Sequence, residues 1–132
     1  GLRLCRVAGR PLEPQSGWHR NPEACMKRYA SVLKMPAENL ARYRELNAAV
    51  WPGGLAKITE CNIRNYSIFH RKGQLFAYFE YVGDDFDADM QKMADDPETQ
   101  RWRDWMMPMQ DPLADRAEGE WWSDMEEVFH TD

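Results

Sequence analysis

The sequence predicts an α+β domain in which helices cover one face of an antiparallel sheet. Residues 63–81 contain two runs of β-branched and aromatic residues around a polar turn with Lys72 and Gly73, which is the pattern of a β-hairpin. Apolar side chains occur on both sides of this hairpin, so both of its faces need to be covered. Segments with helical periodicity precede and follow the hairpin and can cover one face. The other face requires a second sheet or a ligand.

The composition is that of a single globular domain with an acidic surface. The chain has 132 residues, of which 43% are hydrophobic, enough for a core without disulfide bonds. Its net charge of −5 argues against binding to nucleic acid, because phosphate contacts require a basic surface. No apolar run is long enough to span a membrane and no signal-peptide core is present, so we expect a cytoplasmic protein without membrane contact.

The first 25 residues differ in composition from the rest of the chain. They are rich in Pro, Gly and Arg and have no periodicity, so we expect a flexible N-terminal arm without regular structure. Met26 directly precedes the first predicted strand. This leaves two interpretations of residues 1–25 open, a native arm or an over-extended start before a first residue at Met26. The folded domain is expected to comprise residues 26–132.

The segments before the hairpin predict one strand and one helix. Residues 27–35 alternate between the two faces of an extended chain and predict the first strand. Residues 37–51 follow Pro36, which suits the beginning of a helix, and carry apolar residues at helical spacing. Pro52 and the two glycines after it are expected to interrupt this helix before a weaker helical continuation.

Two further helices and a strand are predicted after the hairpin. Phe86 and Met93 mark the first helix, and Asp96 with Pro97 forms the N-cap and first residue of the second. Residues 125–130 predict the last strand. The order β-α-β-β-α-β is that of the ferredoxin-like split βαβ fold, with a four-stranded antiparallel sheet and helices on one face. Its bare face predicts a homodimer in which two sheets face each other.

No sequence motif indicates a metal or an organic cofactor. Asp85, Asp87 and Asp89 alternate as at the opening of an EF-hand calcium loop, but Met90 stands where that loop requires Gly. Carboxylates at the beginning of a helix are explained by the helix dipole alone. None of the three histidines has a second histidine or a cysteine two to four residues away. We therefore expect no bound metal and no cofactor.

Aromatic residues with polar neighbours form a candidate sugar site. The apolar faces of a pyranose stack on aromatic rings, while its hydroxyls bind amides, guanidinium groups and phenols. Such a set exists if the fold brings together Tyr43, Asn47, Tyr66, Trp102 and Arg103. The alternative is that the tryptophans belong to the core.

Five segments carry a resemblance to a known family. They are RYRELNAAVWP (42–52), IRNYSIF (63–69), LFAYFEYVGDDFDADM (75–90), DPETQRW (96–102) and RAEGEWWSDMEEVFH (116–130). Through them the chain from Met26 to Asp132 resembles the L-rhamnose mutarotase family, including relatives proposed to serve L-fucose. The resemblance implies a ferredoxin-like domain that dimerises into an α+β barrel. It also implies interconversion of the α and β anomers of a deoxy sugar without metal or organic cofactor.

The resemblance further implies roles for individual residues. Tyr43 matches a sugar-binding Tyr on the first helix, and Asn47 stands where the family has a proton-donating His. Tyr66 matches a Tyr on the first hairpin strand, and Trp102 matches the first member of a Trp–Trp pair whose second position is Arg103 here. An amide does not titrate near neutral pH, so Asn47 can hold a sugar hydroxyl but cannot relay a proton as imidazole does.

The expected function is an aldose mutarotase that acts on L-rhamnose or L-fucose by acid–base ring opening and closure. Tyr66, His70 or an ordered water can replace the missing proton donor. Two alternatives stay open. One is a sugar-binding protein without catalysis. The other is a dimeric α+β barrel that binds another small molecule, including haem with His70 as its axial ligand.

Overall fold

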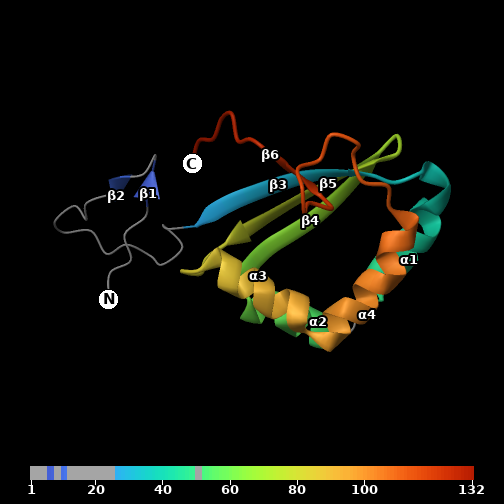
Figure 1. The fold of residues 1–132 in the computed structure, drawn as a ribbon, viewed down its shortest axis with the longest axis horizontal. Coiled ribbons are helices and arrows are strands. Elements are labelled where there is room, and N and C mark those ends of the chain that lie inside the picture. The colour runs from blue at the N-terminus through green and yellow to red at the C-terminus, as the bar shows by residue number, and fades with distance from the viewer. Residues whose placement is uncertain (1–5, 8–9, 12–25, 50–51) are drawn as a thin grey trace.

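A four-stranded antiparallel sheet with helices on one face forms the fold (Figure 1). The computed structural model describes residues 6–7, 10–11, 26–49 and 52–132. The strands lie in the order β4-β5-β3-β6 and are, in chain order, β3 (Lys27–Lys34), β4 (Ile63–Arg71), β5 (Gln74–Tyr81) and β6 (Ser123–Met125). All neighbouring strands are antiparallel. The predicted α+β class and ferredoxin-like strand order are confirmed.

The predicted β4–β5 hairpin is present, with β4 at the edge of the sheet and β5 between β4 and β3. Lys72 and Gly73 form its turn with φ values of 47° and 80°, and glycine adopts such a positive φ without steric cost. A β-bulge lies in β4, because Arg64 pairs with Glu80 whereas Ser67 pairs with Tyr78. The extra residue sets the faces of the strand, so that Tyr66, Ile68 and His70 point to the helix side.

Asn65 holds the bulge in place. Its φ is 51°, a left-handed conformation that Asn tolerates better than most residues. Its side-chain amide donates hydrogen bonds to both carboxylate oxygens of Glu80, at 2.7 and 3.0 Å. The bonds satisfy the carboxylate of Glu80, which is largely buried on the sheet face away from the helices.

The helices before the hairpin differ in one respect from the sequence-based expectation. A 3₁₀ turn (η2, Ala37–Asn39) leads into α1 (Leu40–Ala48), and α2 spans Pro52–Glu60. The expected break between two helical segments is present, but Pro52 and the two glycines after it belong to the second segment, α2, and do not separate the two. A proline costs little in the first turn of a helix, because the N–H that it lacks has no partner there.

The helices after the hairpin begin as predicted. In α3 (Phe86–Asp95) the N-cap Asp85 accepts a hydrogen bond from the backbone N–H of Ala88 at 3.1 Å. In α4 (Pro97–Met106) the N-cap Asp96 accepts one from the N–H of Thr99 at 2.9 Å. A 3₁₀ turn, η3 (Met107–Met109), extends α4. Both caps satisfy backbone donors that a helix leaves free at its beginning.

Two strand expectations need correction. The last strand was placed at residues 125–130, but β6 pairs with β3 only at Ser123–Met125. Beyond it, Val128 and Phe129 are 89% and 79% exposed, so β-branched and aromatic residues alone did not make a strand without a neighbour to pair with.

The first 25 residues were expected to lack regular structure. Two short strands, β1 (Arg6–Val7) and β2 (Arg10–Pro11), pair there, and the other residues of the expected arm lie outside the described ones.

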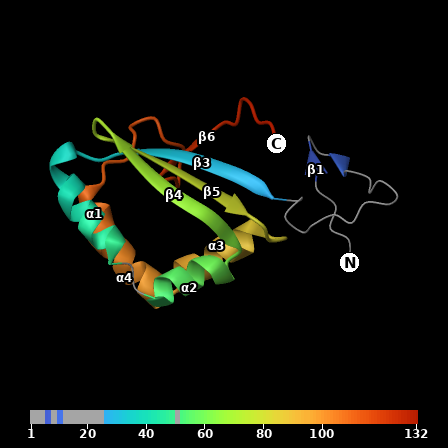
Figure 2. The same ribbon diagram turned by 180° about the vertical axis from the view of Figure 1, so that it is seen from behind.

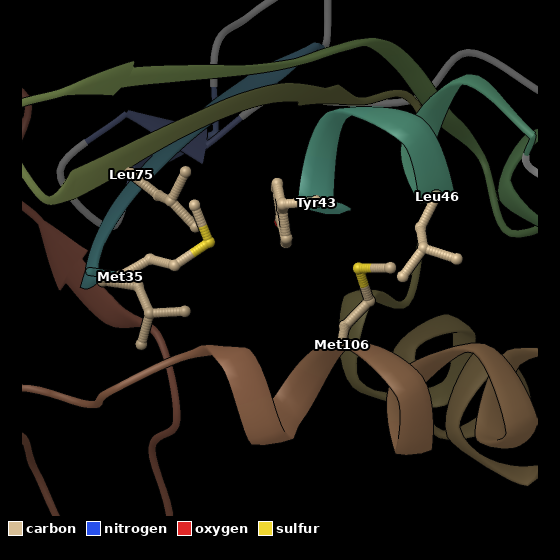
Figure 3. Packing of buried hydrophobic residues seen from close by; sticks show 6 residues of the cluster. Met35, Tyr43, Leu46, Leu75 and Met106 are labelled. Carbon is tan, nitrogen blue, oxygen red and sulfur yellow. The ribbon is translucent and has the colours of Figure 1, made fainter. Parts of the chain in front are cut away.

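The main core lies between the helix-facing side of the sheet and helices α1 and α4 (Figure 3). The core consists of the buried residues Leu33, Met35, Tyr43, Leu46, Leu75 and Met106. Trp102, Trp121 and Trp122 pack against its edge. A second cluster of Cys61, Ile63 and Met93 joins α2, β4 and α3. The core therefore fixes α1 and α4 against β3 and β5.

No described helix covers the opposite face of the sheet (Figure 2). The strand register places Val32, Phe69, Phe76 and Tyr78 on this face, which we call the outer sheet face. Phe69 is 63% exposed. Within the described residues no helix is long and apolar enough to cross a membrane.

Candidate functional site

A cavity of about 960 Å³ opens between the helix-facing side of β4 and helices α1, α2 and α4. This volume lies at the upper end of the range of small-molecule sites, roughly 300–1,000 Å³. All the residues predicted to bind or convert a sugar line it: Tyr43, Asn47, Tyr66, Trp102 and Arg103. They come from α1, β4 and α4, so the fold assembles a site that is scattered in the sequence.

Helix α1 contributes Tyr43 and Asn47, one turn apart on the same side. Tyr43 is only 4% exposed and belongs to the main core, so only a small part of the ring reaches the cavity. Burial raises the pKa of Tyr43, and hydrogen bonding with Gln110 and Asn47 partly opposes the rise. The amide of Asn47 donates to the backbone carbonyl of Tyr43 at 2.8 Å and lies 4.0 Å from Sδ of Met106. These contacts orient the side chain of Asn47, so that its amide oxygen can accept a hydrogen bond from a ligand.

A hydrogen-bonded chain continues from Tyr43 to the C-terminal segment. Nε2 of Gln110 donates to the Tyr43 hydroxyl at 3.4 Å, and Nε1 of Trp121 donates to Oε1 of Gln110 at 2.9 Å. Gln110, Trp121 and Trp122 also line the cavity. Sequence reasoning assigned no role to these three residues, although a Trp–Trp pair after a polar loop is a usable signal for a binding wall.

Tyr66 lies on β4 at the end of a column of aromatic rings. Its ring stacks on Phe79 with centroids 5.7 Å apart, and Phe79 stacks on Tyr29 at 5.2 Å. Tyr29 in turn stacks on Phe86 of α3 at 4.4 Å. One face of the Tyr66 ring is thus covered by protein.

The hydroxyl of Tyr66 stays protonated over the physiological range. The residue keeps 42% of its surface accessible and lines the cavity. Burial there, reinforced by Tyr43, raises the pKa of Tyr66 to about 12, and the charge of Arg103 opposes this rise. Tyr66 therefore acts on a ligand as a hydrogen-bond donor rather than as a base near neutral pH.

Two nitrogens in the cavity wall have no hydrogen-bond partner among the described residues. They are Nε2 of His70 on β4 and Nε1 of Trp102 on α4, and both atoms are buried. An unmet buried polar group costs about 1–3 kcal/mol, so a ligand oxygen or a water that reaches either nitrogen is favoured. Trp102 serves both interpretations left open by the sequence, because it packs on the main core and lines the cavity.

Among the described residues no cluster of three or more His, Cys, Asp or Glu side chains could hold a metal ion. Asp85 caps α3, and Asp89 accepts hydrogen bonds from Tyr81 and Asn62. The acidic stretch therefore has structural roles.

A sequence model described as L-rhamnose mutarotase matches residues 28–131 of the chain. An L-rhamnose mutarotase from Bacillus subtilis (strain 168) is 30% identical over 109 residues, covering 81% of this chain and 100% of the relative. A UPF0734 protein from Dictyostelium discoideum is 30% identical over 113 residues, covering 80% of this chain and 90% of the relative.

Two solved structures share the fold. The L-rhamnose mutarotase FA22100 from Formosa agariphila superposes with a TM-score of 0.64 at 23% identity, covering 80% of this chain and 99% of that one. Tetracenomycin F2 cyclase from Streptomyces glaucescens, a type-II polyketide cyclase, gives a TM-score of 0.64 at 18% identity, covering 80% and 97%. At these identities the two likenesses establish the fold alone.

Proposed function

Because the chain belongs to the L-rhamnose mutarotase family, we propose that its cavity binds a deoxy sugar, L-rhamnose or L-fucose, and interconverts the α and β anomers. The observation that carries the proposal is the convergence of Tyr43, Asn47, Tyr66, Trp102 and Arg103 on one cavity of suitable size. Nothing but proton transfer is required, because opening and reclosing a hemiacetal needs no metal or organic cofactor.

The residues divide between binding and proton transfer. Trp102 offers an indole beside the cavity for an apolar sugar face, and Arg103 offers a guanidinium group to the sugar hydroxyls. The oxygen of Asn47 accepts a hydrogen bond from a hydroxyl, because the amide nitrogen is already bound to Tyr43. Tyr43 supports this wall through Gln110 and Trp121.

Tyr66 is the group that we place at the ring oxygen. In the opening step the C1–O5 bond breaks, O5 takes the phenol proton of Tyr66, and water takes the proton of the anomeric hydroxyl as the C1 carbonyl forms. The phenolate regains a proton from water, and closure on the other carbonyl face reverses the transfers. The charge of Arg103, which opposes the rise in the pKa of Tyr66, stabilises the transient phenolate.

A second candidate function is sugar binding without catalysis. It is favoured by one observation, that the residue one turn after Tyr43 is the non-titrating Asn47. Saturation-transfer NMR of the anomeric protons of L-rhamnose and L-fucose distinguishes the two. Accelerated exchange between the α and β resonances supports the mutarotase. Line broadening of both anomers without exchange supports the binding protein.

We further propose that the protein is a cytoplasmic homodimer. The outer sheet face supports the dimer, because it carries apolar residues and Phe69 is 63% exposed, and a second copy of the same face can cover them.

A further inference from the structure

The cavity is cationic although the protein is acidic. The whole chain has a net charge of −5. The charged side chains that line the cavity are Arg44, Arg64, Arg103 and Glu98, three positive charges against one negative. An excess of one sign of charge in a concave site strengthens the field there. All three arginines are exposed to solvent, so salt screens their charges. The excess of positive charge is a property of the site and not of the composition.

Two of the three guanidinium groups are available to a ligand. Arg64 donates from Nη1 to the backbone carbonyls of Thr59 and Ile63, both at 3.0 Å. Among the described residues, neither Arg44 on α1 nor Arg103 on α4 forms an ion pair or a side-chain hydrogen bond. Arg103 is also close enough to Tyr66 for its charge to affect the phenol.

Glu98 does not neutralise these arginines. A Cβ atom on Gly53 would lie 1.6 Å from Oε2 of Glu98, so the carboxylate packs directly on the first turn of α2. The beginning of a helix carries a partial positive charge that stabilises a carboxylate. Glu98 is thereby accommodated locally, and the positive charge of Arg44 and Arg103 remains for the cavity.

We propose that the cavity prefers a monosaccharide that carries an anionic group, a carboxylate or a phosphate ester, over a neutral sugar of the same configuration. A guanidinium group binds either anion through two parallel hydrogen bonds. The aromatic wall of Trp102, Trp121 and Trp122 holds the ring of such a sugar as it holds the ring of a neutral one. This inference concerns the same cavity as the proposed function but goes beyond it, because L-rhamnose and L-fucose carry no charge.

Within each set, the test compares sugars that differ only at C6, and L-rhamnose is added as a substrate of the proposed function. Binding is measured by quenching of tryptophan fluorescence for D-galactose, D-galacturonate and D-galactose 6-phosphate, for the corresponding glucose and mannose sets, and for L-rhamnose. At least one anionic sugar is expected to bind about tenfold or more tightly than its neutral counterpart. Raising the salt concentration is expected to weaken that binding and to leave the neutral sugar unchanged. The carboxylate and phosphate members distinguish the two anions.

Variants of the arginines test whether the preference for anionic sugars arises from the arginines that line the cavity. In the double variant Arg44→Gln with Arg103→Gln, the ratio of anionic to neutral affinity is expected to fall to about one. Arg42→Gln is the control, because Arg42 lies on α1 outside the cavity and pairs with Glu45 at 3.2 Å, and the ratio is expected to stay unchanged. Thermal unfolding of each variant shows that the fold is retained.

The outcomes separate the inference from the proposed function. Equal affinity for the neutral and anionic members of every set, or a ratio that the double variant does not change, overturns the inference, even where anomeric exchange of L-rhamnose is accelerated. An arginine-dependent preference for an anionic sugar supports the inference, even where no sugar in the panel shows accelerated exchange and the mutarotase proposal fails.

Discussion

The Tyr81 hydroxyl donates a hydrogen bond to the Asp89 carboxylate and so joins the end of β5 to helix α3. The same carboxylate oxygen accepts from Nδ2 of Asn62 at 3.0 Å, and the Tyr81 oxygen accepts from the backbone N–H of Asp85 at 3.1 Å. Both side chains are buried. The bonds from Tyr81 and then Asn62 lower the pKa of Asp89. Burial and then the bond to Asp89 raise the pKa of Tyr81.

The lowered pKa of Asp89 predicts a specific loss of stability in acid. Its contribution to the free energy of unfolding is complete above the unfolded-state value near pH 4 and is lost as pH falls through the lower folded-state pKa. Asp89→Asn is expected to reduce the stability at pH 7 by about 1–3 kcal/mol and to flatten its decline below pH 4, measured by urea unfolding between pH 3 and pH 7. Asp104→Asn on the exposed side of α4 is the control, and the same flattening in that variant would contradict the assignment.

Asn47→His is expected to raise the rate of anomeric exchange. The imidazole would restore a titrating group one turn after Tyr43, and a general acid contributes about 100- to 10,000-fold. We expect a gain of about one to three orders of magnitude, with an inflection in the pH–rate profile at roughly pH 6–7 where imidazoles titrate. NMR exchange with L-rhamnose measures the gain. Asn47→Gln keeps an amide and should show neither effect, so an equal gain in that variant would remove the imidazole from the explanation.

Tyr66→Phe tests the proton donor that we propose. The variant keeps the stacking on Phe79 but removes the hydroxyl, so the exchange rate is expected to fall to nearly that of the sugar in water, and the affinity to fall by about 1 kcal/mol. In the wild-type protein no inflection from Tyr66 is expected below about pH 11, because its pKa is raised to about 12. Tyr78→Phe, on the outer sheet face of β5, is the control. A Tyr66→Phe protein with an unchanged rate would show that the proton comes from elsewhere.

The fold was predictable because its signals are local. The Lys72–Gly73 turn, the caps at Asp85 and Asp96, and the alternation along β3 each act over a few residues. The error in the last strand concerns a feature decided by distant contacts, because residues 126–130 have no described strand to pair with. The error at Pro52 is local, because proline is tolerated in the first turn of a helix as well as at its end.

The sequence predicted which residues line the candidate site, but not how those residues are held there. Tyr66, Trp102 and Arg103 are brought to the cavity as expected, but the sequence could not show that Tyr43 is mostly core or that Gln110 ties it to the C-terminal segment. The sequence also could not show that the cavity has a positive net charge. Arg44 has neighbours of both charges along the chain, and only the fold determines which charged side chains line the cavity.

Phe69→Glu is expected to produce a monomer if the outer sheet face forms the dimer. The charge would stand in the centre of an apolar interface, where an unpaired ion is costly. Sedimentation at micromolar concentration should give about 31 kDa for the wild type, twice the chain mass of 15.5 kDa, and the chain mass for the variant. Trp105→Glu, at a residue that is 52% exposed on α4, should remain a dimer. A wild-type protein that sediments as a monomer would contradict the proposal.

Treatment with a chelator is expected to leave fold and exchange rate unchanged, because no described cluster of side chains provides the three or four ligands of a metal site. The measurement is thermal unfolding and anomeric exchange before and after EDTA, with metal analysis of the untreated protein. Stoichiometric metal that is lost together with activity would refute it.

The bulge in β4 has a consequence for insertions and deletions. Asn65 is the residue that the strand has in excess of its partner, so removing it restores a regular ladder in which Tyr66 lies opposite Phe79 and still faces the helices. A deletion between Ser67 and His70 instead turns the strand positions on one side of it to the opposite face, which breaks the row of Tyr66, Ile68 and His70. Homologous chains are therefore expected to vary in length at position 65 and to keep a constant length from 66 to 71.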